Sequence, residues 1–242
     1  MSRCLFLAGA TGAIGRRLAP LFVATGWRVV GTTRSQAKAT VLSGMGVEPV
    51  VVDVFDAVAL GEAVKDARPD VVMHQLTDLP PGLDPALMAA ASARNARIRE
   101  EGTRNLIDAA LRAGAKKLIA QSIAFAYAEG PLPHHETDPL NVDGEGPAGA
   151  SARAVASLET QVLEAPLGGV VLRYGRLYGP GTGFDTATGA GPVHVDAAAY
   201  AAYRTVAAGA PGIYNIAEDD GAVCSDKAKQ WLGWNASWRI GQ

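Results

Sequence analysis

The sequence has little of several features, and each shortage narrows the class of protein. Its 242 residues include only two cysteines, Cys4 and Cys224, which lie at opposite ends of the chain and form no disulfide framework. Neither the cysteines nor the four histidines have the spacing of a metal site. The formal net charge is only -2, so electrostatics gives no reason to expect a nucleic-acid partner.

Long apolar runs are also missing, and no stretch reaches the length that spans a membrane. The chain enters its first expected strand at once, which argues against a signal peptide. We therefore expect a cytoplasmic protein with no membrane partner. Hydrophobic residues still make up 48% of the chain, enough for the large core of one α/β domain.

A glycine-rich stretch near the N-terminus carries the clearest functional signal. The apolar run 3–8 before it is typical of a buried parallel strand, and apolar residues recur at helical spacing behind it. A helix start offers free N–H groups and a positive dipole end to a pyrophosphate, and glycine keeps that approach open. An ordinary strand-to-helix turn is the alternative. The flanking pattern favours a dinucleotide site formed by Gly9, Thr11, Gly12, Ala13, Ile14 and Gly15.

The rest of the chain alternates apolar runs with helical stretches and carries no hairpin signals. Strands are expected at 27–33, 47–52, 70–75, 117–121 and 169–173, and a long helix at about 85–113. This alternation predicts an α/β fold, a Rossmann-type doubly wound parallel sheet. We expect residues 1–173 to form the dinucleotide-binding domain and residues 174–242 a small C-terminal lobe that closes the substrate crevice.

The glycine spacing G-x-x-G-x-x-G resembles that of the short-chain dehydrogenase/reductase superfamily. Later motifs, in the right order and over nearly the whole chain, resemble its extended, epimerase/dehydratase-like branch. They are Asp70-Val-Val-Met-His74, Gly102-Thr-Arg-Asn-Leu106, Leu172-Arg-Tyr-Gly-Arg-Leu-Tyr-Gly-Pro-Gly181, Val193-His-Val-Asp196 and Gly212-Ile-Tyr-Asn-Ile216. The resemblance implies a nicotinamide dinucleotide cofactor.

The tip of the second strand indicates which dinucleotide is bound. In this fold an acid there selects NAD, whereas an arginine accommodates the 2′-phosphate of NADP. This tip reads Thr33, Arg34, Ser35 and carries no acid, which favours NADP, although a solvated arginine at a helix start is the alternative. The resemblance adds further expected cofactor contacts, namely Asp53, Val54, Leu76, Thr77 and Tyr174.

The resemblance fails at the catalytic positions. The extended branch uses a Tyr-x-x-x-Lys pair, in which the lysine lowers the tyrosine pKa, together with a serine or threonine. Here Ser151 and Val155 stand at the Tyr and Lys positions, and Ile123 stands at that of the hydroxyl residue. Arg99 replaces an asparagine of the long helix. No tyrosine in the chain has a lysine four residues later.

Two residues remain as catalytic candidates. Tyr127 follows the fifth strand, at the edge where ligands bind in open α/β sheets, and packing under a loop is its alternative role. Ser122 precedes Ile123 and would serve only if the turn shifts by one residue. We expect NADPH-dependent reduction of a small carbonyl or enone. An epimerase or dehydratase of a small substrate and a non-catalytic NADP-binding sensor are the alternatives.

The segment between Gly181 and His194 limits the size of the substrate. It holds about a dozen residues, whereas relatives that act on nucleotide sugars carry a longer segment that holds the nucleotide. We therefore expect no useful binding of UDP- or dTDP-sugars. Oligomerisation leaves no readable signal in the sequence.

Overall fold

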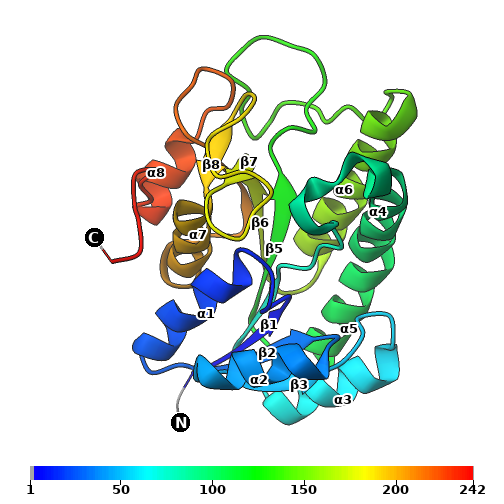
Figure 1. Ribbon diagram of the computed structural model, residues 1–242, viewed down its shortest axis with the longest axis vertical. Coiled ribbons are helices and arrows are strands. Elements are labelled where there is room, and N and C mark those ends of the chain that lie inside the picture. The colour runs from blue at the N-terminus through cyan, green and yellow to red at the C-terminus, as the bar shows by residue number, and fades with distance from the viewer. Residues whose placement is uncertain (1–2, 242) are drawn as a thin grey trace.

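The computed structural model describes residues 3–241, and its centre is a parallel β-sheet (Figure 1). The sheet confirms the predicted Rossmann-type doubly wound fold, because the strand order reverses direction at β1. Its seven strands, in spatial order, are β3 (Glu48–Val51), β2 (Arg28–Thr33), β1 (Cys4–Ala8), β4 (Val71–His74), β5 (Lys117–Ile123), β6 (Gly168–Tyr174) and β9 (Gly212–Ile216).

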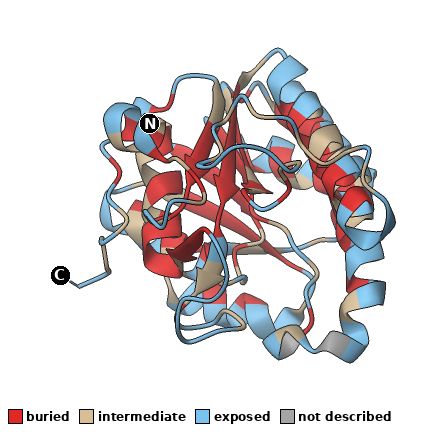
Figure 2. Cartoon of the chain, turned by 90° about the horizontal axis from the view of Figure 1, so that it is seen from above, coloured by how far each residue is buried: buried red, intermediate tan, exposed pale blue. Residues whose placement is uncertain are grey.

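Helices cover both faces of the sheet, so its central strands are buried on both sides (Figure 2). This explains why β1 reads as an uninterrupted apolar run, with all five residues buried. One face is covered by α1 (Gly15–Ala24), α2 (Gln36–Gly44), α7 (Val195–Ala208) and α8 (Asp226–Leu232). The other face is covered by α3 (Ala57–Ala67), α5 (Thr103–Ala113) and α6 (Gly146–Glu164).

The expected long helix is broken into three parts. The helix α4 (Pro85–Arg97) passes into a π-helical turn, η2 (Ile98–Gly102), before α5 begins. A π turn adds one residue to a helical turn and so changes where the following side chains point. Such turns occur often at functional sites, and this one carries Arg99. A short 3₁₀ turn, η1 (Pro81–Leu83), precedes α4.

The segment after β6 contributes to two sheets. The strands β7 (Arg176–Tyr178) and β8 (Pro192–His194) form a separate parallel pair, while β9 extends the main sheet beside β6. An ion pair of 2.7 Å between Arg17 and Asp196 joins α1 to α7. The division after residue 173 stays a prediction. Within residues 3–241, no helix has the length and apolar character to cross a membrane.

Candidate functional site

The glycine-rich turn forms a cradle between β1 and α1, as the sequence predicts. Gly9 has a φ of 88°, and a Cβ added there would lie 2.5 Å from the carbonyl oxygen of Gln75. A Cβ on Gly15 would collide with the carbonyl oxygen of Gly9, which already accepts a hydrogen bond of 3.0 Å from the Gly12 amide. Only glycine fits these positions, and the close approach to the start of α1 fits a dinucleotide pyrophosphate.

Beneath the turn lie buried polar groups that have no partner within residues 3–241. They are both side-chain polar atoms of Gln75 and the hydroxyl of Tyr174. Tyr174 is only 1% exposed and packs in the core with Ala10 and Ile14, and burial raises the pKa of its hydroxyl. Tyr174 is therefore a buried core residue, and its role as a cofactor contact stays a prediction.

At the tip of β2, two arginines share one carboxylate. Arg34 lies 3.1 Å from Asp78, and Arg94 lies 2.9 Å from the same side chain. The hydrogen bond from Arg34, with help from Arg94, lowers the pKa of Asp78. Arg34 also feels the charge of Asp53, and it precedes Ser35, the residue before α2. Asp78 and Arg94 have no sequence signal, because the chain separates them from Arg34 by 44 and 60 residues.

The expected cofactor contacts Asp53, Val54, Leu76 and Thr77 follow the C-terminal ends of β3 and β4. Val54 is buried and its carbonyl accepts a hydrogen bond of 2.9 Å from Asn105. Asp53 accepts from the amide of Phe55 at 3.0 Å, and the Leu76 amide donates to His74 at 3.2 Å. Thr77 follows in the same loop. The structure therefore brings these residues to the edge that the resemblance implies.

His74, the last residue of β4, has a packing role. It is 1% exposed, and its Nε2 lies 3.1 Å from the hydroxyl of Thr103 on α5. Burial, with a smaller effect of the charge on Arg99, lowers the pKa of His74 to about 4. The ring is therefore neutral at pH 7 and joins β4 to α5.

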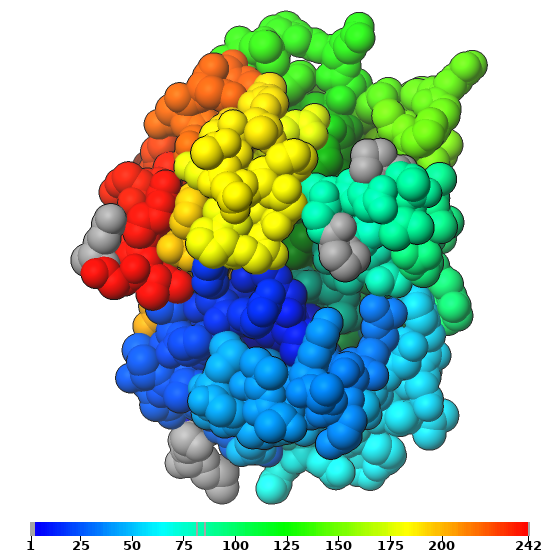
Figure 3. Space-filling model, in the orientation of Figure 1, coloured from blue at the N-terminus to red at the C-terminus, as the bar shows by residue number. Residues whose placement is uncertain are grey.

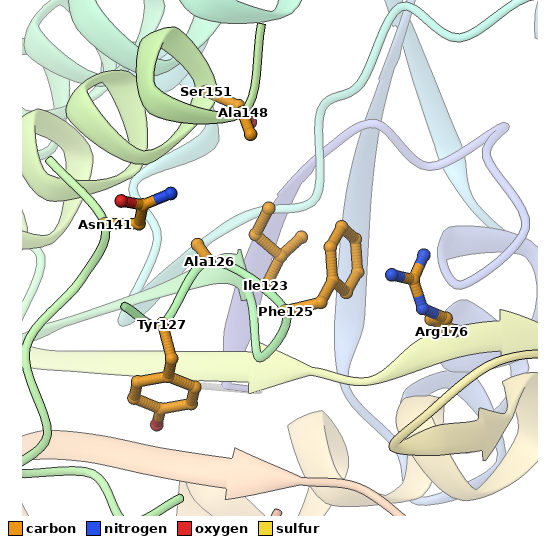
Figure 4. A pocket seen from close by; sticks show the side chains of 8 residues that line it. All are labelled: Ile123, Phe125, Ala126, Tyr127, Asn141, Ala148, Ser151 and Arg176. Carbon is orange, nitrogen blue, oxygen red and sulfur yellow. The ribbon is translucent and has the colours of Figure 1, made fainter. Parts of the chain in front are cut away.

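A separate cavity of about 250 Å³ opens beyond the C-terminal end of β5 (Figure 4). In the space-filling view the surface is hollowed between the yellow segment after β7, the blue turn after β1 and the cyan-green helices (Figure 3). The cavity is lined by Ile123, Phe125, Ala126, Tyr127, Asn141, Ala148, Ser151 and Arg176. Its floor is apolar, and Arg176 is the one charged residue on this lining.

The two catalytic candidates are hydrogen-bonded within the protein. Ser122 is 1% exposed and donates to Glu159 at 2.6 Å, and Glu159 also forms an ion pair of 2.6 Å with Arg173. Arg173 donates to the Tyr127 hydroxyl at 2.9 Å, and that hydroxyl donates to Asn215 at 2.6 Å. Burial raises the pKa of Tyr127.

These hydrogen bonds argue against Ser122 and Tyr127 as proton donors to a substrate. The Tyr127 ring points away from Ser151 and Ala148 on the opposite wall (Figure 4). Both hydroxyls already donate to protein acceptors, which leaves neither of them a proton to offer a ligand while the network holds. The geometry favours a structural role for Ser122 and Tyr127, and their catalytic assignment stays a prediction.

Ser151 and Val155 stand where the related enzymes have the tyrosine and the lysine, and Ser151 contacts Arg99. Ser151 lines the cavity from α6, and Val155, one turn later, is fully buried. Arg99 reaches from the π turn and donates to the Ser151 hydroxyl at 3.0 Å. Sequence reasoning found both substitutions but not their contact, because 52 residues separate them.

Comparison with known proteins gives one family and several relatives. Residues 9–207 match the model of the NAD(P)H-binding family. A curated Streptomyces protein named 3-diazoavenalumate denitrifying reductase is 42% identical over 255 residues, covering 94% of this chain and 79% of the relative.

Solved structures with the same fold are more distant in sequence. The UDP-glucose 4-epimerase of Thermotoga maritima, solved with UDP-glucose, has a TM-score of 0.78 at 19% identity, covering 98% of this chain and 94% of the epimerase. The WbmG enzyme of Bordetella bronchiseptica, solved with NAD, has a TM-score of 0.77 at 17% identity, covering 99% and 91% of the two chains. Identities this low show a shared fold.

Proposed function

This chain belongs to the NAD(P)H-binding family, and we propose that it is an NADPH-dependent reductase of a small acidic substrate. The observation that carries the proposal is an intact glycine cradle beside a separate small cavity at the end of β5. When bound, NADPH supplies a hydride. The cradle holds the pyrophosphate, and the cavity holds the molecule that accepts the hydride.

The proposed preference for NADPH rests on the edge around Arg34. Arg34 and Arg94 carry two positive charges against the single carboxylate of Asp78. A 2′-phosphate would take the place of that carboxylate on Arg34 and form charge-assisted hydrogen bonds. Asp78 belongs to the loop after β4, so it is not the residue at the end of β2 whose carboxylate would bind the ribose hydroxyls of NAD.

The acidic substrate is inferred from Arg176. Its guanidinium lies 4.7 Å from the centre of the Phe125 ring, at the cavity wall. Within residues 3–241 this guanidinium makes no hydrogen bond or ion pair. Arg176 is exposed, so water solvates its guanidinium and a substrate carboxylate could replace that water, while Phe125 and Ile123 would contact an apolar or aromatic body.

The lack of a Tyr–Lys pair favours acceptors that need no strong acid during hydride transfer. A simple carbonyl would become a strongly basic alkoxide, and Tyr127, the titratable acid on the cavity lining, already donates its proton to Asn215. A conjugated enone becomes a less basic enolate. We therefore favour an enone within the carbonyl and enone class that the sequence suggests.

The Streptomyces relative favours a second acceptor, because its name states a diazo compound and a denitrifying reduction. A diazo group conjugated to an oxygen accepts a hydride at its terminal nitrogen, which forms an N–H bond and places negative charge on oxygen. The C–N bond then breaks, N₂ leaves, the hydrogen passes to carbon, and water protonates the oxygen. This route also needs no strong acid in the hydride step.

The test compares the two kinds of hydride acceptor, each attached to a benzene ring that carries a carboxylate. Purified protein is mixed with NADPH and either 4-carboxycinnamaldehyde or the ortho-quinone diazide of 4-hydroxybenzoate, and products are identified by mass spectrometry. We expect protein-dependent NADPH oxidation with at least one acceptor and a higher KM in an Arg176→Leu variant. The matching methyl ester should be insensitive to that substitution. Tight NADPH binding without turnover of either compound would favour the sensor instead.

A further inference from the structure

Arg99 is a partly buried cation without an ion-pair partner within residues 3–241. Burial lowers the pKa of Arg99 from its ordinary value, and an arginine nevertheless stays charged at neutral pH. The carboxylate that attracts it, Glu159, is already paired with Arg173 at 2.6 Å. A partly buried charge without an ion-pair partner lowers the stability of the fold, and π turns often occur at functional sites. Both features indicate a functional role for Arg99.

The direction of the Arg99–Ser151 hydrogen bond leaves a free donor. A guanidinium can only donate, so the Ser151 oxygen accepts the bond of 3.0 Å. The single O–H of Ser151 donates to no group in the described part of the chain. Ser151 and Ala148 lie on the cavity wall across from Ile123 (Figure 4). That O–H is therefore available to a molecule in the cavity.

We propose that Ser151 and Arg99 together replace the missing Tyr–Lys pair, an inference that rests on the proposed reductase function. Ser151 is the catalytic residue and donates its O–H to the substrate oxygen on which negative charge develops. Arg99 is a positioning residue that orients and polarises the Ser151 hydroxyl. Neither group gives up its proton, so the product oxygen takes its proton from water.

The pair also narrows the substrate class. A nearby positive charge disfavours an acceptor that is itself a cation, such as a simple aryl diazonium ion. It favours a neutral acceptor whose conjugated oxygen becomes negative as hydride arrives. Both a conjugated enone and an oxygen-conjugated diazo compound meet this condition. In each, the new bond to hydrogen forms while electrons move onto oxygen, and Ser151 stabilises that oxygen.

A binding experiment tests the donor without any turnover. The probe is 4-(dimethylamino)cinnamaldehyde, an enal whose absorption moves to longer wavelength when its oxygen accepts a strong hydrogen bond. With NADP⁺ present, we expect this red shift in the parent protein and in Ser151→Thr. The shift should disappear in Ser151→Ala and decrease in Arg99→Gln. Arg99→Lys keeps a cation and should restore part of it.

Kinetics with 4-carboxycinnamaldehyde and the quinone diazide then measure the catalytic effect. We expect Ser151→Ala to lower kcat by about 100-fold, the usual loss for one oxyanion donor, with little change in KM. Ser157→Ala is the matched control, because Ser157 lies on the same helix outside the cavity lining. Thermal melting and NADPH binding check that each variant is folded.

The outcomes separate this inference from the proposed function. If the parent reduces a substrate and Ser151→Ala does so at the same rate, the proposed roles of Ser151 and Arg99 are wrong and the proposed reductase function stands. A parent that red-shifts the probe but oxidises no NADPH would reject the reductase and keep the hydrogen-bond pair. A probe absorption that is identical in parent and Ser151→Ala would overturn the pair directly.

Discussion

At the scale of single residues, three arginines differ in how their charge is balanced. Arg34 shares a carboxylate with a second arginine, Arg176 stacks on an aromatic ring, and Arg99 binds a hydroxyl. None of them has a carboxylate of its own within residues 3–241, and each faces a region assigned here to a ligand. Arg34 and Arg176 are exposed and solvated by water, so an anionic partner at either is a proposal, whereas Arg99 is partly buried, where an unpaired charge costs more free energy.

The first prediction concerns Arg34. The protein should bind NADPH more tightly than NADH, because charged hydrogen bonds to the 2′-phosphate contribute about 1.5 to 3 kcal/mol. Arg34→Ala should therefore lower the NADPH affinity about tenfold or more and leave NADH unchanged. Fluorescence titration measures both, with Arg112→Ala at the far end of α5 as the control. Equal affinities for the two dinucleotides in the parent would contradict the assignment.

The second prediction separates the two roles of Tyr127. Tyr127→Phe removes a partner from Arg173 and from Asn215, which should lower the free energy of unfolding by about 1 to 3 kcal/mol. Turnover should persist, because the hydroxyl does not face Ser151. Tyr200→Phe is the control, since the Tyr200 ring stacks on Trp238. Lost turnover with unchanged stability would instead establish Tyr127 as the proton donor.

The sequence predicts single residues well where their role depends on the local chain. Gly9 is recognisable because a glycine turn is a local feature, and the place of Arg34 after β2 is local too, while its role in cofactor choice stays a prediction. The contact between Arg99 and Ser151 was not recognisable, because it depends on how two distant helices pack. The Tyr127 network depends on Asn215, 88 residues away, and was missed for the same reason.

At the scale of helices and strands, strands were easier to predict than helix breaks. Parallel strands buried on both faces give continuous apolar runs, and β1, β2, β4, β5 and β6 lie where such runs occur. The π turn at 98–102 was not predicted, because an inserted residue in a helix leaves the composition helical. The turn matters because it carries Arg99.

The third prediction concerns the contact between β4 and α5. The pKa of His74 is about 4 in the folded protein and about 6.5 in the unfolded chain. Unfolded chains therefore take up the proton first, so stability is full above pH 6.5 and falls as the pH drops toward 4. The loss from this residue is about 3 kcal/mol.

Urea unfolding at several pH values measures this effect. His74→Gln should flatten the dependence between pH 6.5 and 4, whereas His135→Gln, at an exposed position, should leave it as in the parent. A steep dependence that survives in His74→Gln would show that other groups cause the acid sensitivity.

At the scale of the whole molecule, the fold was predictable and the chemistry only in part. Alternating strands and helices, with the glycine turn, are sufficient to predict a doubly wound sheet. The same fold occurs in a UDP-glucose 4-epimerase and in the WbmG enzyme, which share less than a fifth of their residues with this chain. Substrate choice depends instead on the side chains around the cavity, which include Ser151 and Arg176.

The fourth prediction concerns substrate size. The cavity of about 250 Å³ and the short segment between β7 and β8 leave no wall for a nucleotide. We therefore expect no binding of UDP-glucose or dTDP-glucose by calorimetry, with NADPH as the positive control. Micromolar binding of either sugar would overturn this prediction and revive the epimerase alternative.

Deuterium transfer tests the central claim, that this chain reduces a small acidic molecule with NADPH. NADPH labelled with deuterium at C4, in each of its two stereochemical forms, is incubated with 4-carboxycinnamaldehyde or the quinone diazide of 4-hydroxybenzoate. For the enal, whose new C–H bond keeps the label, we predict that one labelled form adds one mass unit to the product and that the other does not. The diazide first forms an N–H bond that exchanges with water, so its readout is product formed only with NADPH. Unlabelled enal product from both forms, or no product from either acceptor although NADPH binds, would contradict the account.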